Sequence, residues 1–213
     1  MNVAMILSGG NGSRFGGELP KQYQILAQKE VIAYTIEAFQ SSHQISQIII
    51  VAAHEYLAEL SIKYCIDAVA AGKTRNESLY NGLIHIKQKY PMCEKIIINE
   101  AARPFIAIDL ANEYLRLLDE YDAVITAQRI TDSLGKEGAA VTDRSQYYLI
   151  QAPEAFRFKL LLEKFKADSP ITATVQQLPI QSKIYKYFGF RNNIKITYPE
   201  DLIIAEQLMR YLK

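Results

Sequence analysis

The stretch NVAMILSGGNGSRFGGELPKQY, Asn2 to Tyr23, joins an apolar run directly to a loop that contains five glycines. The run Val3–Leu7 has the length and continuous apolar character of a buried strand. In an open α/β sheet, ligands bind beyond the carboxyl ends of the strands, which is where this loop follows. Glycines there let backbone N–H groups approach a phosphate, because no Cβ is in the way. The stretch therefore predicts an anion-binding loop with two cations, Arg14 and Lys21.

Further apolar runs along the chain alternate with helical patterns. Three of these runs predict buried strands at Gln47–Ala53, Lys95–Glu100 and Asp122–Gln128. Apolar residues at helical spacing predict helices within residues 30–42, 76–90 and 109–121. Nearly continuous apolar strands favour a parallel sheet that is covered on both faces. The alternation predicts an α/β fold, a Rossmann-like doubly wound and mostly parallel sheet.

The alternation of strand and helix patterns stops after about residue 130, where the chain becomes rich in turn residues. Strand-like pieces around AAV (residues 139–141) and YYLIQ (residues 147–151) predict a β-arm at about residues 130–155 that protrudes from a single domain of residues 1–213. The chain then ends in a well-signalled helix. Thr197 is its expected N-cap, with Pro199 in the first turn and Glu200 as the capping acid.

The composition excludes several classes of function. The chain has 24 Lys and Arg against 23 Asp and Glu, so its net charge of +1 gives no global attraction to nucleic acid or membranes. Cys65 and Cys93 lack the spacing of a zinc or disulfide framework, which favours a reducing compartment. No apolar run approaches the roughly 20 residues of a membrane span. We expect a cytoplasmic protein whose anion site depends on local charge.

The glycine loop does not match the two commonest phosphate-binding motifs. No Gly-Lys-Ser/Thr follows it, which excludes the Walker pattern, and Phe15 stands where the dinucleotide fingerprint needs its third glycine. A guanidinium and a mobile ammonium beside a backbone nest suit a polyphosphate whose charge rises during reaction. The alternative is a flexible surface loop with two solvated cations.

Several segments in order resemble one enzyme family. SGGNGSRFGGELPKQY resembles the signature of cytidylyltransferases that act on methylerythritol phosphate and ribitol phosphate. Similar motifs follow as AGKTRNESLYNGL, NEAARPFI, TDSL, DRSQYYLIQAPEAF and NNIKITYPEDLIIAEQL. The resemblance implies a fold of the nucleotide-diphospho-sugar transferase type. It also implies that a polyol phosphate attacks the α-phosphorus of CTP, releasing pyrophosphate and giving a CDP-polyol.

The resemblance assigns roles to individual residues on the nucleotide side. The cations at the triphosphate and the attacked phosphorus would be Arg14, Lys21 and Lys195. CTP would be bound by Ser8, Gly9, Gly10, Gly12, Gly72, Lys73 and Ser78. Without the family match, Lys21 is compatible with a plain surface lysine, and the spacing of Lys195 indicates only a solvent-facing position. Ser78 is likewise compatible with an ordinary first-turn helix residue.

On the acceptor side the resemblance points to residues of two regions. They are Glu100, Arg103, Ser133 and Arg144, with Glu100 also a candidate ligand for Mg²⁺. In this family the arm reaches into a neighbouring subunit, so the resemblance implies a homodimer in which the arm delivers Arg144. The alternative for Arg144 is a charge on the arm surface.

The chain departs from the family pattern at positions on the acceptor side. Glu100 replaces an aspartate, Asn99 a histidine, and Ala152-Pro153-Glu154 a Thr-Pro-Gln stretch, and Ala173 stands where an acid is expected. The acceptor therefore stays open among methylerythritol 4-phosphate, ribitol 5-phosphate and another polyol phosphate for a surface polysaccharide. A CTP-binding pseudoenzyme or regulatory homologue is the alternative function. A transferase for another NTP or a sugar 1-phosphate is a weaker one.

Overall fold

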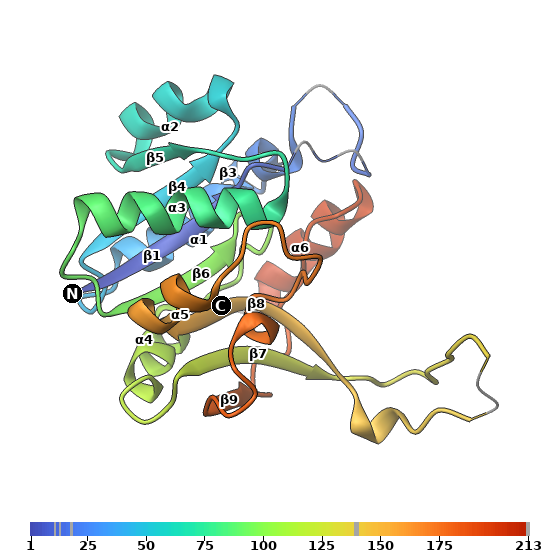
Figure 1. The fold of residues 1–213 in the computed structure, drawn as a ribbon. Coiled ribbons are helices and arrows are strands. Elements are labelled where there is room, and N and C mark those ends of the chain that lie inside the picture. The colour runs from blue at the N-terminus through green and yellow to red at the C-terminus, as the bar shows by residue number, and fades with distance from the viewer. Residues whose placement is uncertain (11, 13, 18, 139–140, 212–213) are drawn as a thin grey trace.

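A seven-stranded sheet forms the centre of the molecule in a computed structural model that describes residues 1–10, 12, 14–17, 19–138 and 141–211 (Figure 1). The strand order is β5-β4-β1-β6-β8-β7-β9. The strands are β1 Asn2–Ser8, β4 Gln47–Ala52, β5 Asp67–Ala70, β6 Lys95–Glu100, β7 Ala123–Arg129, β8 Tyr148–Arg157 and β9 Ile184–Tyr187. β8 runs antiparallel to β6 and β7, and the other pairs in this sheet are parallel. The predicted mostly parallel sheet is confirmed.

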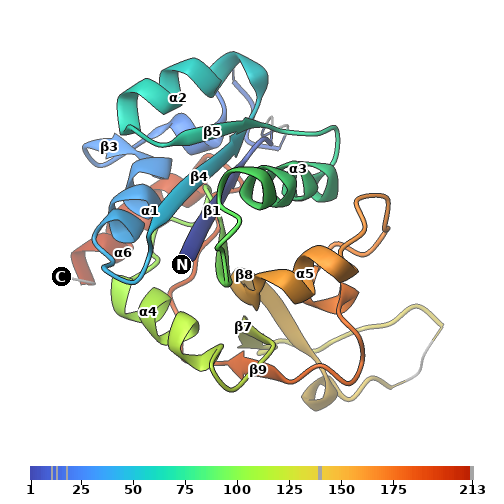
Figure 2. The same ribbon diagram turned by 60° about the vertical axis from the view of Figure 1, so that its left-hand side comes forward.

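Helices cover both faces of this sheet, as Figure 2 shows. Their bounds are α1 Val31–Gln40, α2 Leu57–Tyr64, α3 Arg75–Lys89, α4 Ile108–Leu117, α5 Phe158–Lys164 and α6 Glu200–Tyr211. α1, α2 and α4 pack on one face, and α3 and α5 pack on the other. A small hairpin of β2 (Ile25–Leu26) and β3 (Lys29–Glu30) follows the glycine loop. Among the described residues, no helix has the length and apolar character needed to cross a bilayer.

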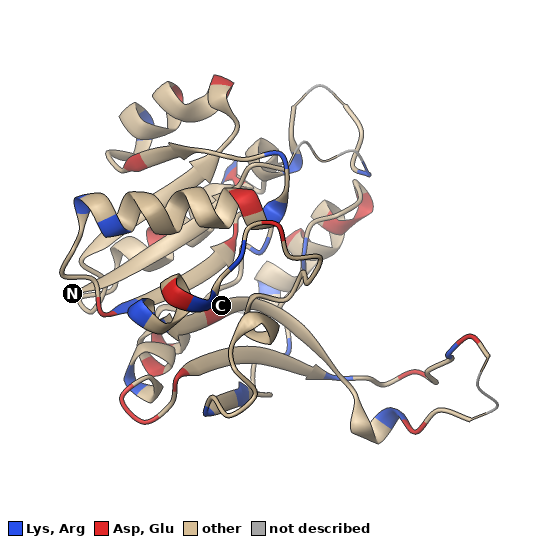
Figure 3. Cartoon of the chain, viewed as in Figure 1, with Lys and Arg blue, Asp and Glu red and all other residues tan. Residues whose placement is uncertain are grey.

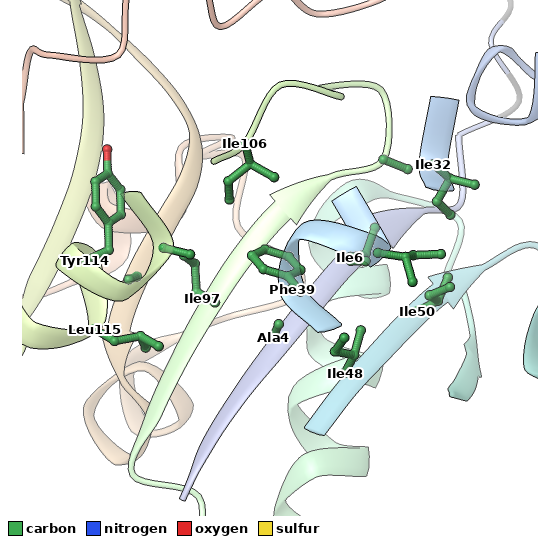
Figure 4. Close-up of a cluster of buried hydrophobic side chains, with 14 of the residues drawn as sticks. Ala4, Ile6, Ile32, Phe39, Ile48, Ile50, Ile97, Ile106, Tyr114 and Leu115 are labelled. Carbon is green, nitrogen blue, oxygen red and sulfur yellow. The ribbon is translucent and has the colours of Figure 1, made fainter. Parts of the chain in front are cut away.

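The first strand shows why the sheet is covered on both sides. Successive side chains of a strand point to opposite faces. Ala4 and Ile6 pack with Phe39 of α1 in the cluster drawn in Figure 4, whereas Val3 and Met5 belong to the cluster on the α3 side. All of these side chains are fully buried. A strand whose residues are all apolar therefore packs against a hydrophobic cluster on each face of the sheet.

The arm differs in part from the prediction. β7 and β8 pair in the sheet, and residues 130–138 and 141–147 extend away from it between them, with a short 3-10 helix at Arg144–Gln146 (Figure 1). β8 itself is a sheet strand and its residues Ala152–Phe156 are buried, so the predicted boundary at residue 155 was too late. The strand-like piece YYLIQ that the sequence assigns to the arm is thus the first half of β8 and pairs with β7 in the sheet. Ala139 and Ala140 lie outside the described residues.

The start of α6 also differs in detail. The backbone N–H groups of Thr197 and Tyr198 donate to Asp201 Oδ2 at 2.7 and 2.9 Å. The Thr197 hydroxyl donates to the Lys195 carbonyl instead of capping the helix. Asp201 therefore supplies the capping carboxylate that we expected from Glu200. This cap fixes the chain immediately after Lys195.

Candidate active site

A cavity of about 600 Å³ opens at the carboxyl ends of β1 and β6. β1 lies between β4 and β6, so the strand order reverses at this point and leaves a crevice in which α/β proteins bind ligands. We call it the first cavity. It is lined by the glycine loop, the segment from Gly72 to Ser78, the end of β6, and Lys195 with Thr197.

The glycine loop is held by side chains of the short 3-10 helix that follows it, Lys21–Tyr23. Gln22 is buried, and its amide donates to the carbonyls of Ser8 (2.8 Å) and Gly10 (3.1 Å). The hydroxyls of Tyr23 and Ser8 lie 3.0 Å apart. Burial raises the pKa of Tyr23 to about 12, against the opposing effect of these hydrogen bonds, so its hydroxyl stays neutral. The Pro-Lys-Gln-Tyr motif thus fixes the loop and brings Lys21 to the cavity.

The glycine loop meets the second loop of the cavity at close range. A Cβ on Gly9 would lie 2.5 Å from the Cβ of Ala71, a distance that real Cβ atoms do not adopt. On Gly72 it would lie 2.3 Å from the Cβ of Glu77. Both positions therefore require glycine for packing, independently of any ligand.

The second loop is ordered by the first turn of α3. Thr74 caps the helix by accepting from the Glu77 backbone N–H, and the Glu77 carboxylate accepts from the Lys73 N–H at 2.7 Å. Ser78 Oγ accepts from the Gly72 N–H at 3.0 Å and donates to the Thr74 carbonyl at 2.8 Å. Ser78 thus lines the first cavity and also holds the loop in place.

The three cations assigned from the sequence lie around the same cavity. Arg14, Lys21 and Lys195 all line it, together with Lys73 and Arg75. Burial and the charges of Lys195 and Arg14 lower the pKa of Lys21, which places these cations within electrostatic reach of one another. Figure 3 shows basic segments gathered at this end of the sheet.

Lys195 reaches the cavity because its neighbours are anchored. The Ile196 N–H donates to the Ala102 carbonyl at 2.8 Å, and the Ile196 side chain is fully buried. The amide of Asn193 donates to the Ala152 carbonyl at 2.7 Å. The segment forms no regular strand among the described residues, yet Ile194 and Ile196 pack in one apolar cluster while Lys195 lines the cavity. Lys195 Nζ accordingly lies 2.7 Å from Glu100 Oε2.

Glu100 is the carboxylate that these cations share. Arg103 Nε lies 3.1 Å from it and Arg75 Nε lies 3.7 Å from it. Burial alone would raise the pKa of Glu100, but Lys195, Arg103 and Arg75 together lower it to about 2. Within the described part of the chain no three His, Cys, Asp or Glu side chains gather to hold a metal ion. A single carboxylate fits only an ion held mostly by substrate phosphates.

A second cavity of about 240 Å³ adjoins the first and shares Arg75, Glu100 and Lys195 with it. We call it the second cavity. Its other lining residues are Arg103, Ile150, Gln151, Ala152, Glu154, Thr172 and Ala173. Of the positions that depart from the family pattern, Glu100, Ala152, Glu154 and Ala173 therefore all line this cavity, whereas Asn99 is fully buried and does not. From the sequence, Glu154 was noted only as a departure from the family pattern, with no role of its own.

Two of the predicted acceptor residues lie elsewhere. Ser133 and Arg144 are exposed on the arm, and neither lines either cavity. The Arg144 guanidinium donates to the Thr131 carbonyl within the arm. One chain thus assembles Arg14, Lys21, Lys195, Glu100 and Arg103 but does not bring the arm residues to them.

Comparison with known proteins agrees with this geometry. Residues 2–211 match the model of the family described as IspD, 2-C-methyl-D-erythritol 4-phosphate cytidylyltransferase. Proteins of that name from Clostridium botulinum strain 657 and Alkaliphilus oremlandii are each 31% identical, over 99% and 97% of this chain and 98% and 94% of theirs. The crystal structure of 4-diphosphocytidyl-2C-methyl-D-erythritol synthase from Anaerococcus prevotii superimposes with a TM-score of 0.84 at 25% identity, covering 98% of this chain and 96% of that one.

Proposed function

The chain belongs to the 2-C-methyl-D-erythritol 4-phosphate cytidylyltransferase family, and on that premise we propose that it transfers a cytidylyl group from CTP to 2-C-methyl-D-erythritol 4-phosphate. The products are the CDP-polyol and pyrophosphate. The observation that carries the proposal is the convergence of Lys21 and Lys195 beside the glycine loop in one cavity. The adjoining second cavity offers a place for the acceptor.

The chemistry needs no nucleophile from the protein. A phosphate oxygen of the acceptor attacks the α-phosphorus of CTP, a P–O bond to that phosphorus forms, and the bond to pyrophosphate breaks. Negative charge builds on the phosphoryl oxygens and on the leaving group as this happens. Fixed cations stabilise such charge best where water is excluded. We assign this role to Arg14, Lys21 and Lys195, with Lys195 nearest to the acceptor because it also lines the second cavity.

The nucleotide itself would be held mainly by backbone groups. Ser8, Gly9, Gly10 and Gly12 present the first loop to the triphosphate, and Gly72, Lys73 and Ser78 present the second loop to the cytosine. Polar backbone groups of a fixed loop can match the donor and acceptor pattern of one base. The Lys73 side chain is exposed, so we assign this contact to its backbone.

We propose Mg²⁺ as the divalent cation of the reaction. When bound, it would be held by phosphate oxygens of CTP with Glu100 as its protein ligand, and it would neutralise charge on the triphosphate. Glu100 is suited to this because its low pKa keeps it ionised across the physiological range. Glu100 and Arg103 would also position the acceptor.

We propose that the active enzyme is a homodimer built through the arm. Ser133 and Arg144 are exposed and lie outside both cavities of their own chain. If they contact the acceptor, as the family resemblance implies, they do so in a second copy. The use of CTP favours a cytoplasmic location.

The direct test measures pyrophosphate release from CTP with a panel of acceptors. We expect release with 2-C-methyl-D-erythritol 4-phosphate, and CTP to be preferred over UTP and GTP. Release only with ribitol 5-phosphate or another polyol phosphate would reassign the acceptor and keep the chemistry. Calorimetry with CTP alone is the second measurement. A protein that binds CTP but releases no pyrophosphate with any acceptor is a pseudoenzyme.

A further inference from the structure

Arg75 stands at the boundary of the two cavities and lines both. It is the first residue of α3, directly after the loop that we assign to the cytosine. Its guanidinium is engaged on every nitrogen. Nε faces Glu100 Oε1 at 3.7 Å, NH2 faces Glu154 Oε1 at 3.7 Å, and NH1 donates to the Thr172 carbonyl at 3.0 Å and to Thr174 Oγ1 at 3.2 Å.

Glu154 is an unusual partner, because it lies in the middle of β8 and is only 2% exposed. Its Oε2 accepts from the Val175 N–H at 3.2 Å. Burial raises the pKa of its carboxyl and nearby Glu100 raises it further, while Arg75 is the leading opposing influence. A buried carboxylate without a cation is strongly unfavourable, so Arg75 is the partner that favours the charged form of Glu154.

These contacts form a line of alternating charge along the shared wall. Lys195 and Arg103 hold Glu100, Glu100 faces Arg75, and Arg75 faces Glu154. The line joins the first turn of α3 to the end of β6 and the middle of β8. A shift of the second loop on nucleotide binding would therefore reach both carboxylates of the second cavity through one guanidinium.

We propose that the Arg75–Glu154 pair shapes the acceptor side of the second cavity, that Arg75 is a positioning residue because it neutralises the buried Glu154 carboxylate, and that this pair couples the second cavity to the nucleotide loop. The proposal rests on the proposed function for the identity of the acceptor. In this arrangement Arg75 acts on the acceptor through Glu154 and the cavity wall and does not contact the nucleotide.

The test compares Arg75→Gln, Glu154→Gln and the double variant, with binding measured by calorimetry so that turnover is not needed. The probes are α,β-methylene-CTP, whose bridging carbon blocks pyrophosphate release, and then 2-C-methyl-D-erythritol 4-phosphate added to that complex. Arg75→Gln leaves Glu154 buried and unpaired, so we expect the acceptor Kd to rise about tenfold and the analogue Kd to change less than about threefold. In the double variant no unpaired charge remains, and we expect the acceptor Kd to return to within about threefold of wild type.

Unfolding in urea gives a second measurement on the same four proteins. The loss of stability in Arg75→Gln should be largely recovered when Glu154→Gln is added, which is strong non-additivity for groups in direct contact. Arg116→Gln and Glu113→Gln provide the matched control, since that pair is exposed on α4 and lies away from both cavities. Its variants should leave every measured Kd unchanged.

Two results would overturn the proposal. One is a double variant that binds the acceptor no better than Arg75→Gln, and the other is an analogue Kd raised as much as that of the acceptor, which would make Arg75 a nucleotide contact. Wild-type protein that releases no pyrophosphate with any acceptor would overturn the proposed function instead. The unfolding comparison would still decide whether Arg75 and Glu154 depend on each other, and additive losses would refute their pairing.

Discussion

The first and second cavities share a wall but are built in different ways. The first is enclosed by two loops of one chain, which pack on each other so closely that Gly9 and Ala71 leave no room for a methyl group. The second is lined by charged side chains from β6, β8, α3 and the Lys195 segment, and the arm residues assigned to it lie elsewhere. Nucleotide recognition is thus fixed by backbone geometry, whereas acceptor recognition depends on side-chain charge and a second copy. The predictions below test this division, from the largest effect to the smallest.

The largest effect should come from Lys195, the cation that belongs to both cavities. Lys195→Ala removes a charge from the attacked phosphorus, so we expect kcat to fall by about 10²–10³. Its ammonium is partly exposed, at 35% for the side chain, so the midpoint of thermal unfolding should change little. Steady-state pyrophosphate release and a thermal melt measure the two quantities. Lys87 is an exposed lysine of α3, so Lys87→Ala is the control. A Lys195→Ala enzyme with near wild-type kcat would contradict the assigned role of Lys195 in the reaction.

The second prediction tests the backbone construction of the first cavity. Gly9→Ala places a methyl group 2.5 Å from the Cβ of Ala71, so one of the two loops must move. We expect the Kd of CTP to rise at least about tenfold, as for other local distortions of a binding loop. Calorimetry with CTP measures it. Gly135→Ala on the arm is the matched control, because a Cβ there meets nothing within 4 Å. Equal CTP affinity in both variants would show that loop packing does not govern nucleotide binding.

The third prediction tests whether the arm of a second copy completes the acceptor site of the second cavity. If Arg144 of one copy serves the acceptor of another, Arg144→Ala should raise the acceptor KM about tenfold and leave the KM of CTP unchanged, as expected for loss of a charge-assisted contact. Lys136→Ala, another exposed cation of the arm, should have no such effect. Mixing Arg144→Ala with Lys195→Ala chains should restore activity, because hybrid dimers contain one complete site. No recovery on mixing, with dimers confirmed, would place both residues in the same chain's site.

The same division explains what could be predicted from the sequence. The strands β1, β4, β6 and β7 were predicted because they are apolar on both faces. The strands β5 and β9 were not predicted, since each has only four residues and is less buried at the sheet edges. The glycine loop and its cations carry a local pattern that can be recognised in a short stretch.

Contacts between distant segments had no such local pattern. Gln22 gives no sign that its amide holds Ser8 and Gly10, and Glu154 looks like any polar residue until β8 places it under Arg75. Lys195 was assigned through the family resemblance, because spacing alone indicates only a solvent-facing side chain. Side chains that depend on tertiary packing therefore needed the structure, while the loop shaped by its own glycines did not.

The smallest effect concerns pH, and it compares the lysine that follows the glycine loop with the carboxylate that both cavities share. Burial, Lys195 and Arg14 lower the pKa of Lys21, so this cation loses its proton at a lower pH than a free lysine does. Because the reaction needs the charged form, kcat/KM for CTP, which reports the free enzyme, should decline on the alkaline side at a lower pH than an ordinary lysine would impose. Lys21→Arg should keep this parameter flat to higher pH, because a guanidinium stays protonated. Glu100 should contribute no acid limb above about pH 4, since Lys195, Arg103 and Arg75 outweigh its burial and hold its pKa at about 2. An alkaline limb that persists unchanged in Lys21→Arg would assign the titration to another group and weaken the role of Lys21 in the first cavity.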